Sequence, residues 1–248
     1  MAGLEELSYL VIPDTHGRYE QVARIVDTYD AKIDKFVFLG DVLNGPDPRQ
    51  LIKFIRELGH IAITVVGNHE WVYRNALSEK NESMAKLWRR TFMSHYEDGT
   101  LESYGIRWTR HWDHNAYMLR EVMGETGDLE WLNSLPTHFE TDTFIALHAG
   151  PELDKPWSKQ ASQLEEESDN RIVKEPTQIL SQELAHEKDV PETVDERAFI
   201  TGHAHLKEMP IKDRIGQRRV RLASDIWSKE PFFVWNSITK AVEACSYN

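Results

Sequence analysis

The stretch Ile61-Ala62-Ile63-Thr64-Val65-Val66-Gly67-Asn68-His69-Glu70 sets a pattern that the rest of the chain repeats. Residues 61–66 are small or β-branched, which favours a buried strand. Gly67 ends this strand, and the polar side chains of Asn68 and His69 follow at once. In open α/β sheets, ligands and catalytic groups lie just beyond the carboxyl ends of the strands. We therefore expect Asn68 and His69 to lie where the chemistry takes place.

Four further apolar runs end in the same way. They span residues 9–12, 36–39, 144–147 and 198–201, and each leads into an acid or a histidine. A single strand that ends in a histidine is common and indicates little. Five strands that deliver Asp, His and Asn side chains to one edge of a sheet predict a shared metal site.

The residue types at these strand ends suit a pair of hard divalent cations. Two metal ions about 3.5–4 Å apart can share a bridging carboxylate and bind one phosphoryl group between them. Such ions prefer carboxylate, amide and imidazole ligands to thiolates. In Asp-x-His and His-x-His segments of extended backbone, alternate side chains point the same way, so both can reach one ion. The candidate metal ligands are Asp14, His16, Asp41, Asn68, His148, His203 and His205.

Composition narrows the class of protein. The chain has 248 residues, enough for one large domain or a domain with an insert, and a formal net charge of −12. This charge argues against binding to extended nucleic acid or to an anionic membrane, but is compatible with anionic substrates held through metal ions. No apolar run reaches the roughly 20 residues that span a bilayer. Cys245 is the only cysteine, and the first residues lack the cationic region of a secretory signal, so we expect a cytoplasmic protein.

The order of elements predicts a parallel sheet in the first part of the chain. Apolar residues recur at helical spacing from Tyr19 to Tyr29. A second helix has Asp47 as its N-cap and Pro48 in its first turn, and Gly59 ends it. The β-α-β-α-β order up to residue 67 therefore predicts parallel strands with right-handed crossovers.

The later part of the chain departs from this alternation. We interpret residues 1–248 as a single domain, with an insert at about residues 71–140 that lies over the site and selects the substrate. The insert should contain helices at residues 83–96 and 128–135, and an acidic stretch, residues 152–195, should contain one at 177–186. Residues 219–223, 232–235 and 238–244 should form an antiparallel end to the chain.

The strand-end motifs together resemble those of the calcineurin-like metallophosphoesterases. The segments that carry the resemblance are Asp14-Thr15-His16-Gly17, Gly40-Asp41-Val42-Leu43-Asn44-Gly45, Gly67-Asn68-His69-Glu70, His148-Ala149-Gly150 and Gly202-His203-Ala204-His205. The resemblance implies an α/β fold, a four-layer αββα sandwich, with a partly helical insert near the active site. It also implies that Asp14, His16, Asp41 and His205 hold one metal ion, and that Asp41, Asn68, His148 and His203 hold the other.

The same resemblance implies a hydrolytic mechanism. A metal-bound hydroxide would attack phosphorus in line, Asp41 would bridge the two ions, and His69 would protonate the leaving oxygen. Asn44 stands where the protein phosphatases have an aspartate that orients this histidine. Asn68 and Arg18 are the candidate substrate-binding residues, although an arginine at a helix start can also face solvent. The ions would be two divalent metals, manganese first, with iron, zinc, nickel, cobalt and magnesium as alternatives.

The substrate is less well defined than the chemistry. The chain is most similar to the Ser/Thr protein phosphatases and the symmetrical diadenosine tetraphosphatases, but the phosphate-binding arginine that these proteins have after Asn44 is missing. Arg74, Arg89 and Arg90 of the insert could replace it, or could be solvated helix charges. We predict hydrolysis of a phosphomonoester or phosphoanhydride in a small phosphorylated or nucleotide substrate, or in a phosphoprotein. The alternatives are a phosphodiesterase or nuclease and a metal-bearing interaction module without turnover.

Overall fold

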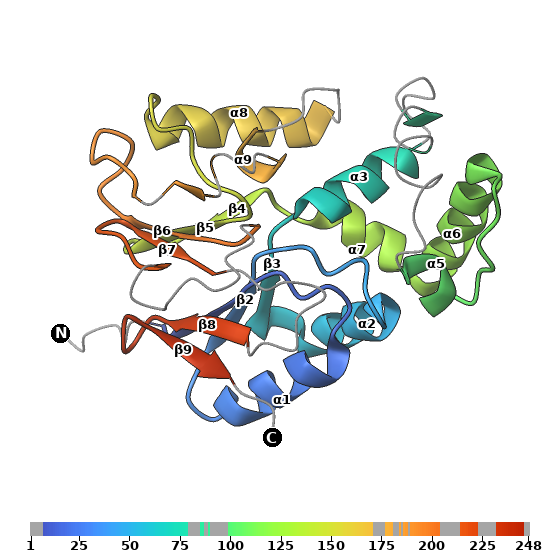
Figure 1. Ribbon diagram of the computed structural model, residues 1–248, viewed down its shortest axis with the longest axis horizontal. Helices are drawn as coiled ribbons and strands as arrows, with labels where there is room; N and C mark the ends of the chain where they lie inside the picture. The colour runs from blue at the N-terminus through green and yellow to red at the C-terminus, as the bar shows by residue number, and fades with distance from the viewer. Residues whose placement is uncertain are drawn as a thin grey trace.

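The protein is an α/β sandwich built on two sheets. The computed structural model describes residues 7–78, 85–86, 89, 99–170, 177–180, 184, 186–187, 189–203, 214–222 and 232–245. The first sheet has the order β3-β2-β1-β8-β9, and the second has the order β4-β5-β6-β7. In Figure 1 the first sheet lies below the second, with α1 and α2 beside the first and α8 above the second.

The first sheet is parallel at one side and antiparallel at the other. β1 (Tyr9–Ile12), β2 (Lys35–Phe38) and β3 (Ala62–Thr64) run parallel, as the sequence predicts. β8 (Phe232–Asn236) pairs antiparallel with β1, and β9 (Ala241–Cys245) pairs antiparallel with β8. In the second sheet, β4 (His138–Glu140) is antiparallel to β5 (Phe144–Leu147), while β6 (Ala198–Thr201) and β7 (Arg219–Arg221) continue parallel to β5.

Alternation along the strands produces the four layers. Val11 and Val37 point toward the second sheet and pack with residues such as Ile200 of β6. Leu10 and Phe36, one residue earlier on each strand, belong instead to the core that includes the buried faces of α1 (Tyr19–Tyr29) and α2 (Pro48–Leu58). Because both faces are covered, the strands are apolar on both sides. The two sheets with helices on their outer faces confirm the predicted sandwich.

Contacts between aromatic rings join the layers. Tyr9 of β1 and Phe144 of β5 lie 5.3 Å apart between ring centroids, and Phe144 lies 5.1 Å from Trp235 of β8. On the outer side of the second sheet, Trp157 of α8 (Trp157–Asn170) meets Phe199 of β6 edge to face at 5.6 Å. These contacts help to fix the position of one sheet relative to the other. The ends of strands from both sheets therefore meet at one place.

The predicted helix signals near the site are confirmed. The Asp47 side chain accepts a 3.2 Å hydrogen bond from the Gln50 N–H at the start of α2, and Gly59 follows its end with a φ of 59°. The turn η1 (Gly59–Ile61) then leads into β3. α3 (Asn68–Ala76) begins directly at the Asn-His-Glu segment, and α7 (Asp128–Ser134) matches the helix predicted at 128–135.

Several other predictions need correction. β3 covers residues 62–64 rather than 61–66, because Val66 donates to the Pro136 carbonyl outside the sheet. β7 is parallel to β6 and not part of an antiparallel end. α6 (Trp112–Thr126) and α8 were not predicted; few positions of α8 are apolar, whereas Trp112, Ala116, Leu119 and Met123 of α6 do recur at helical spacing. α5 (Thr100–Ser103) and α9 (Thr177–Leu180) are short; the predicted helix at 83–96 lies almost entirely outside the described residues.

No helix in the described part of the chain combines the length and the hydropathy that crossing a membrane requires.

Candidate metal centre

The motif side chains converge because strand ends from both sheets meet. Asp14 follows β1, Asp41 follows β2, and Asn68 follows β3, whereas His148 and His203 follow β5 and β6 of the second sheet. The single sheet edge expected from the sequence is therefore formed by two sheets. His148 and His203 approach the others across the sandwich.

Tight turns orient these side chains, and not the extended backbone expected at the Asp-x-His and His-x-His segments. His16, Asp41 and His203 have φ angles of 42°, 49° and 61°, in the left-handed region that residues with side chains rarely occupy. Non-glycine residues held in this region cluster at functional sites, where the surrounding structure compensates for the strain. Three of the predicted ligands thus have the strained backbone that is typical of functional sites.

One group of possible metal ligands lies around His148. Suitable donor atoms of Asp41, His148 and His203 all lie within 4.8 Å of one another. The Nε2 atom of His148 is 3.5 Å from Asp41 Oδ2 and 2.9 Å from His203 Nδ1. Asn68 completes the group, with its side-chain oxygen 2.8 Å from the same Nε2 atom.

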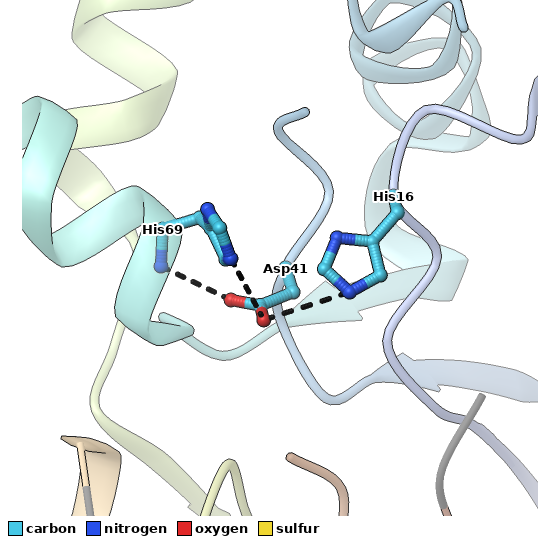
Figure 2. Close-up of side chains that lie close together, drawn as sticks. All are labelled: His16, Asp41 and His69. Carbon is cyan, nitrogen blue, oxygen red and sulfur yellow. Dashed lines mark hydrogen bonds and ion pairs between the residues drawn. The ribbon is translucent and has the colours of Figure 1, made fainter. Parts of the chain in front are cut away.

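A second group lies on the other side of Asp41. His16, Asp41 and His69 also bring their donor atoms within 4.8 Å of one another. Figure 2 shows the Asp41 carboxylate between the two imidazoles, with Oδ2 at 3.8 Å from His16 Nε2 and 3.7 Å from His69 Nε2. Asp41 therefore belongs to both groups, which is the position that a bridging carboxylate requires.

The Asp14 carboxylate contacts both histidines of the first group. It accepts hydrogen bonds of 2.9 and 3.1 Å from the His203 backbone N–H, and its Oδ1 lies 3.7 Å from His148 Nδ1. His205, the remaining predicted ligand, lies outside the described residues. The distribution of ligands between two ions stays a prediction.

The hydrogen bonding around Asn68 tests whether these residues fit a cation. His148 Nδ1 donates to the Leu39 carbonyl at 2.7 Å, so Nε2 presents a lone pair. The Asn68 side-chain oxygen then faces this lone pair, His203 Nδ1 at 2.9 Å and Asp41 Oδ2 at 3.0 Å. Turning the amide would place its N–H₂ group there and satisfy the acceptors with protons. With the Asn68 oxygen inward and His203 Nδ1 unprotonated, four acceptors meet at one point, and a cation satisfies them together.

Burial shapes the charge of the same groups. Burial and the nearby charge of Asp41 raise the pKa of Asp14 well above its ordinary value. Burial raises the pKa of Asp41 to about 7, and burial together with the neighbouring His203 lowers the pKa of His148 well below its ordinary value. Buried carboxylates are costly unless a positive charge compensates them. Neutral imidazoles and carboxylates without thiolates form a donor set that fits divalent Mn, Fe or Zn.

Comparison with known families identifies this arrangement. Residues 7–223 match the family model described as calcineurin-like phosphoesterase. The chain belongs to this family. The predicted resemblance is thus confirmed over most of the sequence.

Curated relatives of this calcineurin-like protein are symmetrical bis(5'-nucleosyl)-tetraphosphatases. The relative from Methylococcus capsulatus is 36% identical over 67 residues, which are 26% of this chain and 24% of that protein. The relative from Aeromonas hydrophila is 36% identical over 62 residues, 24% of this chain and 23% of that protein. The chain therefore matches about a quarter of the length of these relatives.

Solved structures share the fold over nearly the whole chain. A protein assigned as a diadenosine tetraphosphatase has a TM-score of 0.57 at 15% identity, covering 98% of this chain and 95% of that one. A serine/threonine phosphatase from Saccharomyces cerevisiae has a TM-score of 0.52 at 12% identity, covering 100% and 82%. At these identities the two structures establish the fold.

Asn44 and His69 of this calcineurin-like chain are in contact, as predicted. The Asn44 amide nitrogen hydrogen-bonds the Nδ1 atom of His69, and His69 is partly open to solvent, with 23% of its side chain exposed. An amide that donates to Nδ1 leaves the imidazole proton on Nε2, the atom that faces Asp41. His69 can therefore present an N–H toward the centre without carrying a charge.

Two buried residues that accept hydrogen bonds at this site were assigned no role from the sequence. Thr100 of α5 is fully buried, and its hydroxyl accepts a 3.0 Å hydrogen bond from the Asn44 N–H. Glu70 is also fully buried, and its carboxylate accepts four backbone N–H bonds, from Asp41, Val42, Leu43 and Gly67, at 2.7, 2.9, 2.8 and 3.0 Å. The signal for Glu70 was its place as the third residue of α3 behind Gly67, a helix-capping position.

The arginines considered for phosphate binding have scaffold contacts. Arg18 is buried, donates to the carbonyls of Thr15 and Asp14 at 3.0 and 3.1 Å, and lies 4.0 Å from the ring centroid of Phe232. Arg74 donates to the Asn133 carbonyl at 2.7 Å, and Arg89 donates to the Ala76 carbonyl at 2.6 Å. Arg90 lies outside the described residues, and a substrate contact from Arg18 stays a prediction.

Proposed function

We propose that this protein is a hydrolase with two divalent metal ions that cleaves a phosphomonoester or a phosphoanhydride. The observation that carries the proposal is the place of Asp41 in both groups of donor atoms. Family membership supports the same class of reaction. Asp14 and His16 would complete the site on one side, and Asn68, His148 and His203 would complete it on the other.

The metal ions would supply the chemistry that side chains lack. When bound, two divalent ions polarise a phosphoryl group and lower the pKa of an attacking water. We propose manganese as the native metal, since the donors are carboxylate, amide and imidazole. The contribution of the chain is to hold these donors in place, and the Leu39 carbonyl does so for His148 by accepting a hydrogen bond from its Nδ1–H group.

His69 would act on the leaving group. Its Nε2 atom lies 3.7 Å from Asp41 Oδ2, so a phosphate bound at the centre places its leaving oxygen near this imidazole. To donate a proton and end as a neutral imidazole, His69 must start as the imidazolium, with protons on both ring nitrogens. The Asn44 amide would then turn its oxygen toward Nδ1–H and orient the ring, and Nε2–H would donate the proton. Positioned proton transfer of this kind contributes roughly 10²–10⁴-fold to a rate.

We propose a small nucleotide substrate of the dinucleoside polyphosphate type. The curated relatives that match part of the chain are tetraphosphatases of this kind. The insert at about residues 71–140 would select among substrates, because all the predicted metal ligands lie outside it. The net charge of −12 favours a small substrate over extended nucleic acid, and a single cysteine fits a cytoplasmic enzyme.

A phosphodiester is the second candidate substrate. No arginine stands between Asn44 and Gly45, where the related phosphatases have one that binds phosphate. A diester carries less negative charge than a monoester and depends less on such a cation. The two candidates therefore differ in the substrates that should be hydrolysed fastest.

A substrate panel tests the proposal. The full chain, loaded with manganese, is assayed with p-nitrophenyl phosphate, diadenosine tetraphosphate, a phosphopeptide, bis-p-nitrophenyl phosphate and a cyclic nucleotide, with the Asp41→Asn variant as control. We expect fastest turnover of diadenosine tetraphosphate, lost in the control. Preference for the two diesters would favour the second candidate. A protein that binds two ions per chain and hydrolyses none of these compounds would be an interaction module.

A further inference from the structure

A buried arginine lies between the two histidine loops of the second sheet. Arg219 of β7 is 1% exposed and stands beside Phe199 in the parallel pairing of β6 and β7. Its Nη2 atom donates to the Ala149 carbonyl at 2.7 Å and to Thr201 Oγ1 at 3.2 Å, and its Nε atom donates to the same hydroxyl at 3.3 Å. Ala149 directly follows His148, and Thr201 precedes His203 by two residues. One guanidinium therefore joins the two loops that carry these imidazoles.

The packing around the guanidinium is close. A Cβ atom built on Gly150 would lie 2.6 Å from Arg219 Nη2 and 3.1 Å from its Cζ atom, so the Gly150 backbone rests directly against the side chain. The two loops also bond to each other, since the Gly202 N–H donates to the His148 carbonyl at 2.8 Å. Any movement of Arg219 would be transmitted to both loops.

The electrostatics of this position need an explanation. Burial and the neighbouring Arg221 lower the pKa of Arg219 to about 9, so it is still a cation at neutral pH. Within the described residues, no carboxylate forms an ion pair with it, the charges of Glu187 and Asp189 compensate its charge only in part, and Nη1 has no hydrogen-bond partner. A buried cation without a directly paired carboxylate is costly, and an apolar side chain of similar volume would fill the space at lower cost. What arginine adds is a rigid fork of N–H donors that can reach two loops at once.

We propose that Arg219 is a positioning residue that holds the His148 and His203 loops at the separation one metal ion requires. The inference rests on the proposed function, in which both histidines bind the same ion. Ligand positions must be correct to about 0.2 Å for tight metal binding. Groups that orient the ligands without touching the metal typically contribute 10–100-fold to affinity. Its charge works in the opposite direction, because a cation near two dications repels them.

Removing Arg219 should weaken metal binding if the residue positions the loops, and should strengthen it if only charge repulsion acts. The direction of the change in metal affinity therefore distinguishes the two. Manganese binding to the full-length, metal-free protein is measured by titration calorimetry, and bound metal is counted by mass spectrometry. Arg219→Met should weaken binding of one of the two ions about 10–100-fold. The matched control is Arg221→Met, on the same face of β7 and 4% exposed, whose Nη1 donates at 3.0 Å to the carbonyl of His186, a residue outside both histidine loops. The control should lose comparable stability and change affinity less than threefold.

Two gentler variants cover the case in which Arg219→Met does not fold. Arg219→Lys keeps the charge but cannot reach both acceptors, and Gly150→Ala displaces the guanidinium without removing it. Both should weaken the same ion. Unchanged or tighter binding in the Arg219 variants would overturn the positioning role, since only charge repulsion would remain. A wild-type protein that binds two ions but hydrolyses nothing would instead overturn the proposed function and leave this inference intact.

Discussion

Replacing Glu70 by glutamine tests how the Asp41 loop is held. Each carboxylate oxygen accepts two bonds: Oε1 from the Val42 and Leu43 N–H groups, and Oε2 from those of Asp41 and Gly67. Glutamine keeps one oxygen and places an NH₂ group at the other position. Two buried N–H groups then face a donor and lose their acceptor.

The size of the loss follows from these contacts. A buried donor left without a partner costs about 1–3 kcal/mol, so two cost about 2–6 kcal/mol. Burial and the charge of Asp41 raise the pKa of Glu70 to about 7, so removing the charge relieves part of the cost. We expect a net destabilisation of about 3 kcal/mol, a large fraction of the 5–15 kcal/mol typical of a folded domain. For a chain of this size, that lowers the melting temperature by about 6–12 °C.

The assay is thermal unfolding in EDTA, so that bound metal does not add to stability. The matched control is Glu57→Gln, since the Glu57 side chain is 64% exposed and only its 3.9 Å ion pair with Lys53 is lost. The control should change stability by no more than about 0.5 kcal/mol. A melting temperature of Glu70→Gln equal to that of the control would refute the idea that Glu70 secures the Asp41 loop.

Three further predictions concern the metal bridge, the acid and pH. Asp41→Asn should abolish most activity and lower the manganese content below two ions per chain; two ions and near-normal turnover would contradict the bridge. His69→Asn should slow alkyl phosphates about 10²–10⁴-fold and p-nitrophenyl phosphate much less, with metal content unchanged; a uniform loss across leaving groups would argue for a ligand role. Arg197 hydrogen-bonds Asp195 and lowers its pKa, so the stability from this pair is complete above the pKa of an unfolded aspartate and disappears as pH falls through the lower folded value. Asp195→Asn should therefore lower the melting temperature at pH 7 and progressively less below pH about 4, and an equal deficit at both would contradict this sign.

The local pattern of the sequence was sufficient for the strands that carry the site. The predicted runs at 9–12, 144–147 and 198–201 coincide with β1, β5 and β6, because short apolar runs followed by a polar turn specify both the strand and its end. The α2 helix was equally well marked by Asp47 and Gly59. By contrast, α8 buries Trp157 and Leu164 among mostly polar residues, which left too few apolar positions for its period to be recognised.

The sequence by itself determined which side chains could serve the metals, since the identity of Asp41, Asn68 or His148 after a strand is a local property. Only the tertiary structure decided that these side chains come from two sheets and that Asp41 belongs to both donor groups. It also decided the partners of Glu70 and Arg219, whose hydrogen bonds reach backbone groups as far as 29 and 70 residues away. Such contacts leave no periodic trace in a sequence, because the acceptor or donor is a backbone group that every residue carries.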